Sequence, residues 1–185
     1  MSHREVIVAM TRERLLQAVE TSWVLIGVQP EDIDLSAAVL KGAFLRQARL
    51  ARADLNHTDL TRTNLFGADL KDPDLHGAFL FGCDLNCADM HKANLRESDL
   101  DDARLGEADL RSAMRGAAIL KQADLTGADL TGADLTGAHL RRTKLRAAAV
   151  SRAQLQQAAA LGDAVLPDGS SDPAGGQATA GELKS

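Results

Sequence analysis

The chain has 185 residues, a net charge of −5 and only 3% aromatic residues, with four Phe, one Trp and no Tyr. This length fits one domain with short end segments, and the scarcity of large side chains indicates a core of Leu and Ala. There is no apolar run of about 18 residues, which excludes a membrane-spanning helix, and no long apolar stretch typical of a secretory signal. We therefore expect a cytoplasmic protein.

Residues 1–30 are expected to cap the N-terminal end of the domain. Residues 11–20 predict a short helix with Thr11 as its N-cap, and residues 23–28 predict an extended segment that leads into the next region. The apolar face of this helix comprises Leu15, Leu16 and Val19. Trp23 is interpreted as packing within this cap, with contact to a partner protein as the alternative.

A five-residue period dominates residues 31–155. Of the 25 positions 35, 40, 45 and so on to 155, 22 are Leu, and the exceptions are Met90, Arg115 and Val150. The residue two places earlier is Ala in 18 of the 25 repeats, and the residue between them is Asp or Asn in 14. This period fits neither an α-helix, with about 3.6 residues per turn, nor a single strand, in which side chains alternate.

The chain must therefore turn once per repeat, with Ala and Leu inside and Asp outside. Seven glycines stand two residues after a Leu, at the third position of a turn, where a type II turn needs a positive φ. They are Gly42, Gly67, Gly77, Gly82, Gly127, Gly132 and Gly137. Stacked coils would then place their Leu side chains in ladders.

The unit Ala-Asp-Leu-Thr-Gly, clearest over residues 123–137, resembles the repeat of the pentapeptide-repeat proteins. The resemblance covers roughly two thirds of the chain. It implies an all-β solenoid, a right-handed quadrilateral β-helix with about 20 residues per coil and short helical caps at the N- and C-terminal ends. On this geometry residues 31–150 make about six coils, with Leu55, Leu75 and Leu95 in one Leu ladder and Leu85, Leu105 and Leu125 in another.

Two departures from the pattern predict local irregularity. Arg115 stands where a Leu should point inward, and burying an unpaired guanidinium would be costly, so we expect Arg115 and Gly116 to bulge while Met114 turns into the core. Pro73 replaces Ala at an inward position and removes a backbone donor, which predicts weaker pairing between coils there.

The C-terminal region can be read in two ways. Residues 151–160 fit either a last repeat or a helix with Ser151 as N-cap, and their Ala, Leu and Gln content favours the helix. Residues 151–167 are assigned to a C-terminal cap and residues 168–185 to a disordered tail. A helix followed by Leu-Pro-Asp-Gly resembles the end of many cyanobacterial members of the family, which indicates a bacterial, cyanobacterial-like source.

Residues that could carry chemistry do not converge in this pattern. The twelve Asp at the outward position recur on every face, and the four histidines His57, His76, His91 and His139 spread over three of the four faces. Cys83 takes an inward position as a small apolar group and Cys87 falls at an exposed corner, too few for a disulfide framework or a thiolate metal site. We expect no catalytic, cofactor or metal site, and no enzyme.

One set of outward positions is apolar instead of acidic. Val39, Phe79 and Ile119 share one column and alternate with Asp59 and Asp99. Phe81 lies around the corner from Phe79, and Phe66 also lies at a corner. This set is a candidate contact for a partner or for a second copy of the chain.

These observations favour a non-enzymatic scaffold that binds an unidentified protein, as a monomer or as a homodimer through an end cap. The alternative implied by the resemblance is a DNA mimic that binds DNA gyrase and protects it from quinolones, which requires a strongly acidic rod. Residues 31–155 contain 19 acidic and 17 basic residues, a net charge of only −2. Nucleic acid is an unlikely partner, although the last coil is basic through Arg141, Arg142, Lys144 and Arg146.

Overall fold

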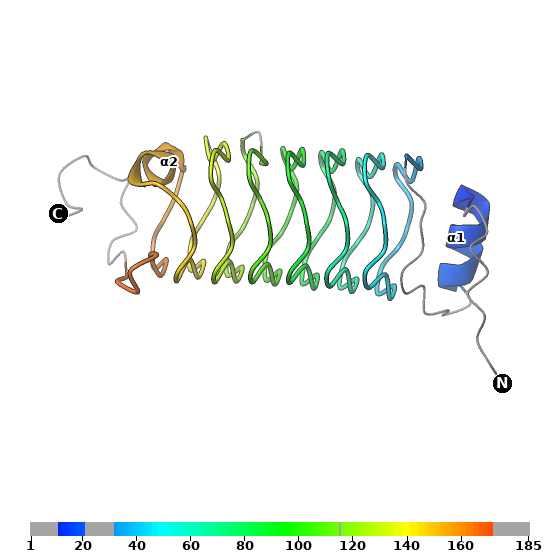
Figure 1. Cartoon of the computed structure of the whole chain (residues 1–185), viewed down its shortest axis with the longest axis horizontal. Coiled ribbons are helices and arrows are strands. Elements are labelled where there is room, and N and C mark those ends of the chain that lie inside the picture. The colour runs from blue at the N-terminus through cyan, green and yellow to red at the C-terminus, as the bar shows by residue number, and fades with distance from the viewer. Residues whose placement is uncertain (1–10, 21–31, 115, 172–185) are drawn as a thin grey trace.

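The computed structural model describes residues 11–20, 32–114 and 116–171. Helix α1 (Arg12–Glu20) lies at one end, helix α2 (Arg152–Gln157) lies near the other, and between them the chain winds into a stack of regular coils (Figure 1). Trp23, the predicted segment 23–28, Arg115 and residues 172–185 fall outside the described residues. Neither described helix is long and apolar enough to cross a membrane.

Each coil has four sides and returns to the same place after 20 residues. The sides pair through single β-bridges between parallel segments, in four columns that begin with the pairs Asp34–Asp54, Val39–Asp59, Phe44–Asn64 and Arg49–Asp69. We name each column after its first residue. In the described part of the chain no longer strand forms, because each repeat is extended for only about three residues before it turns.

Backbone hydrogen bonds run in both directions from every regular coil. In the repeat centred on Leu60, the Leu60 N–H donates to the Phe79 carbonyl in the following coil at 2.8 Å. The Asp59 N–H donates to the Ala38 carbonyl in the preceding coil at 2.9 Å. The turn closes through Thr63 N–H to the Leu60 carbonyl at 2.9 Å. Because these bonds recur with the repeat, the coil obtains its backbone pairing without long strands.

The corners impose a left-handed backbone on the third turn position. Between residues 32 and 147 all 24 such positions have a positive φ, 7 of them at the predicted glycines and 17 at other residues such as Ala37 and Cys87. The prediction from glycine is therefore confirmed, but the coil holds ordinary residues in this region too. A non-glycine residue there costs about 1–2 kcal/mol, which packing and pairing of the coils must offset.

The interior is a continuous ladder of Leu and Ala. Every Leu at a repeat centre from Leu35 to Leu145 is fully or almost fully buried, including the predicted ladder residues. Threonines that replace the inward Ala remain buried because their hydroxyls donate to the carbonyl of a Leu in the preceding coil, as Thr58 does to Leu35 at 2.8 Å and Thr63 to Leu40 at 2.8 Å. Buried Cys83 makes the equivalent contact to Leu60.

Helix α1 joins the first coil through apolar packing and through the Arg12 side chain. Leu15 is fully buried in the same apolar cluster as the coil residues. The Arg12 guanidinium donates to the carbonyls of Asp34 at 2.8 Å and Ser36 at 3.0 Å, and pairs with the Asp34 carboxylate at 3.2 Å. The predicted N-cap residue Thr11 accepts the Arg14 N–H at 3.3 Å.

Helix α2 has the predicted N-cap. Ser151 and Gln154 form a reciprocal capping box, and Leu155 is buried. The Gln154 amide also donates to the carbonyls of Leu130 at 2.7 Å and Ala133 at 2.9 Å, which ties the helix to the preceding coil. Of the two readings of residues 151–160, the helix is the correct one for residues 152–157.

The chain resumes the coil after α2 with a shift of one residue. Ala160 pairs with His139 and Val165 with Lys144, so the spacing is 21 instead of 20. Residues 168–171 continue as a turn, in which Leu166 N–H donates to Ser170 at 2.8 Å and Val165 pairs with Ser171. The prediction of a disordered tail from residue 168 is therefore wrong for residues 168–171, whose backbone is paired.

The coil that contains Arg115 is irregular in the expected way. Met114 is fully buried and has a φ of 82°, and Gly116 has a φ of 92°. The Gly116 N–H donates to the Asp134 carbonyl at 3.2 Å, a bond that the central residue makes in regular repeats. Met114 is thus the side chain that this repeat places in the core, as predicted.

Pro73 has a different effect from the one predicted. Its neighbours keep their pairing between coils, since Asp74 N–H donates to Ala53 at 3.1 Å and Asn94 N–H donates to the Pro73 carbonyl at 3.0 Å. In regular repeats the N–H at this position closes the turn to the preceding Leu, not the bridge between coils. Proline therefore removes the turn bond to Leu70, and the expectation of weaker coil pairing is wrong.

Candidate functional site: the outer surface of the coils

The outward Asp and Asn residues serve the backbone of their own turns. In all fourteen repeats that carry one, its side-chain oxygen accepts the N–H of the residue two places later, at 2.9–3.4 Å. These residues are Asp34, Asp54, Asp59, Asn64, Asp69, Asp74, Asp84, Asp89, Asn94, Asp99, Asp109, Asp124, Asp129 and Asp134. The repeat thus uses Asp and Asn as Asx turns, which explains their regular spacing.

These hydrogen bonds favour the ionised carboxylate. The side chain and N–H of Thr131 hold the pKa of Asp129 below its ordinary value, and Thr136 does the same for Asp134. For Asp109 the Arg111 guanidinium is the main cause of a lowered pKa. The carboxylates of Asp109, Asp129 and Asp134 therefore favour the charged form and already have hydrogen-bond partners.

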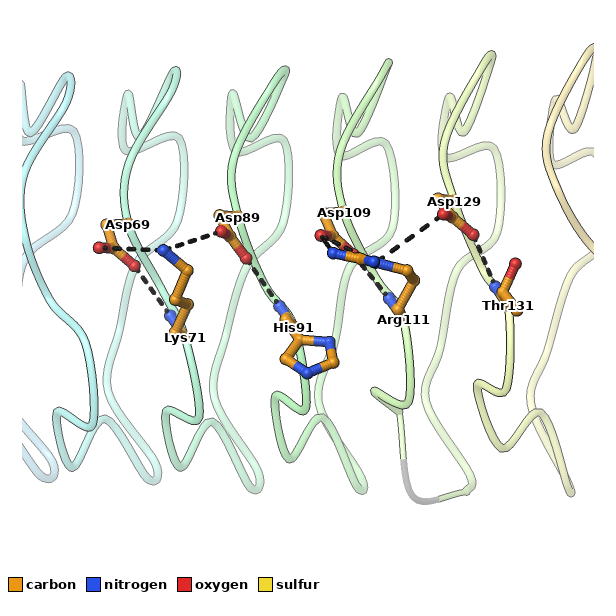
Figure 2. Close-up of polar contacts among 8 residues, drawn as sticks. All are labelled: Asp69, Lys71, Asp89, His91, Asp109, Arg111, Asp129 and Thr131. Carbon is orange, nitrogen blue, oxygen red and sulfur yellow. Dashed lines mark hydrogen bonds and ion pairs between the residues drawn. The ribbon is translucent and has the colours of Figure 1, made fainter.

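The Arg49 column carries four consecutive Asp residues, with cations beside them (Figure 2). The Lys71 ammonium lies 3.6 Å from the Asp69 carboxylate and 3.1 Å from that of Asp89, so it bridges two coils. Arg111 likewise pairs with Asp109 at 2.6 Å and reaches Asp129 at 3.9 Å. Half of this acidic row is therefore neutralised by residues of the adjoining corner.

Two repeats without an outward Asp obtain the same hydrogen bond from the preceding coil. The outward residues there are Arg104 and Ile119. Two places later, the Gly106 N–H donates to the Asn86 side chain and the Lys121 N–H donates to the Asp101 side chain, each at 2.8 Å. In these two repeats a neighbouring coil thus satisfies the turn N–H that the repeat itself cannot.

Three outward residues are large, apolar and exposed. Val39 is 68% exposed, and Phe44 and Phe79 are each 52% exposed. Phe44 was missed in the sequence, although it occupies the outward position as the other two do. We call Val39, Phe44 and Phe79 the apolar set.

The other predicted contact residues are less accessible. Ile119 and Phe81 are half-buried, and Phe66 is half-buried with the Arg46 guanidinium 4.5 Å from its ring centre. The bridges confirm that Val39, Phe79 and Ile119 share one column, with Asp59 and Asp99 between them. Val39 and Phe44 lie on adjoining sides of the first coil, which extends the exposed apolar surface around a corner.

The basic C-terminal coil is partly neutralised. Lys144 pairs with Asp124 at 3.2 Å, and Arg142 approaches Asp163 at 3.7 Å. Both pairs are exposed, where ion pairs contribute little to stability but reduce the local field. This coil is therefore less positive than its sequence indicated.

The cysteines lie as the sequence predicted, Cys83 buried and Cys87 exposed. Burial raises the pKa of the Cys83 thiol to about 12, which keeps it protonated. The histidines differ from the prediction, because His57 and His76 come together with ring centres 5.3 Å apart. A prediction based on the sides of the coil does not bring these two residues together, because both lie at a corner.

A small, open hollow lies on the described surface. It is lined by Asp72, Pro73, Asp74, Lys92 and Asn94. Among the described residues, His, Cys, Asp and Glu side chains form no metal-binding group of three or more.

The chain was compared with known proteins. A family model described as pentapeptide repeats matches it in 8 copies that together run from residue 31 to residue 158. No curated protein sequence matches the chain.

Several solved structures are similar to it. HetL from the cyanobacterium Nostoc sp. strain PCC 7120, a pentapeptide-repeat protein involved in the regulation of heterocyst differentiation, is 24% identical over 88% of this chain and 99% of its own, with a TM-score of 0.30. Rfr23 from the cyanobacterium Cyanothece 51142 is 24% identical over 72% and 88%, with a TM-score of 0.29. Trypsin-treated QnrB1, a plasmid-mediated fluoroquinolone resistance protein, is 17% identical over 67% and 73%, with a TM-score of 0.37.

The family model covers well over half of the sequence, and the 20-residue coils agree with it. The chain belongs to the pentapeptide-repeat family, whose fold is a right-handed β-helix.

Proposed function

We propose that this chain is a non-enzymatic scaffold that binds a protein partner through the apolar set. The observation that supports this proposal is the exposure of Val39, Phe44 and Phe79 at positions where the fold uses Asp or Asn. Each of these residues places an apolar side chain in water and gives up an Asx turn.

The fold does not need apolar residues at these positions. Among the described residues, no acceptor is found for the N–H of Lys41, Arg46 or Phe81, the groups that an outward Asp would satisfy. An intramolecular hydrogen bond of this kind contributes about 0.5–1.5 kcal/mol. Since the three residues weaken their turns and pack little, a contact surface for another protein is the better explanation.

We assign the two ends of the solenoid to capping. A solenoid exposes an apolar cross-section and unpaired backbone at each end unless something covers them. Leu15 of α1 and Leu155 of α2 are both buried in the apolar core cluster. With both ends covered, the sides of the coils are the surface open to a partner, and a monomer is the simplest state.

The test is an affinity capture from the native host with the full chain as bait. The triple variant Val39→Asp, Phe44→Asp, Phe79→Asp introduces the residue that the repeat itself prefers, so it should remain folded and lose the captured partner. His139→Asp, in the same column as Val39 and Phe79, is the matched control and should retain the partner. Equal capture by the triple variant and the wild type would contradict the proposal.

The DNA-mimic alternative requires a face of unpaired negative charge. On the Arg49 column, the most acidic row described above, Lys71 and Arg111 lie beside the carboxylates. A gyrase supercoiling assay distinguishes the two functions: inhibition of gyrase or protection from a quinolone would favour the mimic over the scaffold.

A further inference from the structure

One corner of the solenoid brings two imidazoles together from adjacent coils. His57 and His76 lie 19 residues apart, and the His57 N–H donates to the His76 carbonyl at 2.9 Å, so the coil pairing itself holds them side by side. Their ring centres are 5.3 Å apart, with an angle of 67° between the ring planes.

The backbone positions each ring. Nδ1 of His76 lies 2.9 Å from the Arg96 carbonyl. Because a carbonyl only accepts, this contact assigns the proton to Nδ1 and leaves the lone pair of Nε2 available. A hydrogen bond from one ring nitrogen to a backbone carbonyl is the usual support for a metal-binding histidine.

The ring of His57 occupies space that only a glycine leaves free. A Cβ atom on Gly77 would lie 2.5 Å from Nδ1 and 2.6 Å from Cε1 of His57. The imidazole therefore lies over the Gly77 backbone and leans along the solenoid axis toward His76.

The separation of the rings matches that of two ligands on one ion. Two imidazole nitrogens bound to a tetrahedral Zn²⁺ at about 2.0–2.1 Å place their ring centres about 5 Å apart. We infer that His57 and His76 form a surface site for a divalent transition metal of the Zn²⁺ class, which imidazole prefers. Since no third His, Cys, Asp or Glu completes a metal-binding group among the described residues, water fills the remaining positions and the site is open to an exogenous ligand.

The test uses the full chain with His3→Ala in every protein compared, so that this further histidine of the sequence does not contribute. Zn²⁺ binding is measured by calorimetry and Co²⁺ binding by its visible absorption. Saturable binding of one ion per chain is expected, weakened at least tenfold by either His57→Ala or His76→Ala. His91→Ala and His139→Ala are matched controls that should retain the affinity.

A second pair of variants tests the geometry without removing a ligand. Gly77→Ala should weaken metal binding, because its Cβ displaces the His57 ring, whereas Gly67→Ala, at another corner, meets only the flexible Gln47 side chain at 3.7 Å and should not. Both variants should stay folded, since Ala37 and Ala117 already occupy the same corner position with a positive φ. Equal metal affinity of the wild type and the His57→Ala, His76→Ala double variant would overturn the inference.

Discussion

At the centre of a regular repeat, a Leu side chain is enclosed by the coils before and after it. The side chain of the residue just before this Leu faces solvent. The inner position is Leu in 22 of 25 repeats, and the outer one is Asp or Asn in only 14. Both positions recur with the same period, but a substitution has a different effect at each. At the inner position it removes packing against two neighbouring coils, and at the outer position it removes one turn hydrogen bond.

Within each five-residue repeat, the inner positions therefore provide stability and the outer positions are available for function. The inner residues hold the coils together and can vary little. Replacing an outer Asp by Phe, Val, Arg or His costs about the stability of one hydrogen bond. At Gly106 and Lys121 the preceding coil supplies that hydrogen bond instead. Binding surfaces can therefore arise on the outside without loss of the fold.

The most severe way to break the inner ladder is a charge at its middle. Leu85→Asp should lower the free energy of unfolding by about 4 kcal/mol or more, because Leu85 is fully buried and no partner is available for a carboxylate there. Loss of the cooperative thermal transition in circular dichroism is the measurement. A melting temperature within a few degrees of the wild type would show that the inner position tolerates charge.

A smaller effect is expected at the irregular coil. Gly116→Ala should destabilise the protein by about 1–3 kcal/mol, because φ is 92° and the new Cβ would lie 3.2 Å from the Thr136 carbonyl oxygen. Gly42→Ala is the regular counterpart, with no atom within 4 Å of its Cβ and a φ of 70°. Chemical unfolding should show the larger loss for Gly116→Ala, and equal losses would mean that the bulge is no more constrained than a regular corner.

At the outer position the predicted loss is smaller again. Asp134→Ala removes the acceptor of the Thr136 N–H and should cost about 0.5–1 kcal/mol, since the turn is exposed and water replaces part of the bond. Asp134→Asn should cost less, because Asn64 and Asn94 make the same turn. Urea unfolding of both variants tests whether the hydrogen bond, and not the charge, is what the repeat requires.

Acid should weaken the same outer turns. The pKa values of Asp129 and Asp134 are lowered by their Thr partners, so the stabilisation is complete above the ordinary carboxyl value of 3.8 and is lost as the pH falls through the lower folded value. Unfolding measured from pH 5 downward should show stability decreasing below about pH 4. The Asp129→Asn, Asp134→Asn double variant should decrease less steeply, and an unchanged slope would contradict this assignment.

The smallest effect is expected from a substitution that adds a turn hydrogen bond at an outward position. Phe79→Asp should leave stability unchanged or raise it by up to about 1 kcal/mol, because the carboxylate can accept the Phe81 N–H. Leu80→Asp, one residue later, points inward and should unfold the protein. Destabilisation by Phe79→Asp would show that this ring supports the coil and would weaken its role as a contact.

Periodicity predicted the parts of the fold that repeat. Leu at every fifth position predicted the ladder, and the glycines predicted corners that the coil then imposes on Ala37 and Cys87 as well. The inward turn of Met114 was also predicted from the sequence, because a buried guanidinium at the next position would be too costly. These inferences succeeded because each depends on contacts that are the same in every repeat.

The outer surface was predicted less well, because its contacts join specific residues. The sequence placed the outward Asp on the outside without a role, whereas its carboxylate closes a turn, a role that its position before every corner could have indicated. Phe44 was overlooked although it occupies the same position as Val39. For Pro73 the sequence predicted the loss of the wrong hydrogen bond. Whether an N–H closes a turn or pairs two coils depends on the direction in which it points in the coil.

The period, the inward and outward residues, the corners and the helix at Ser151 could be predicted from the amino-acid sequence, since these features depend on local geometry and burial. Which residues of different coils meet could be learned only from the folded chain. The 20-residue coil places Lys71 between two carboxylates and His57 beside His76, and the return of the chain after α2 shifts by one residue. Such pairs depend on the exact path of the chain around the corners, which no five-residue pattern specifies.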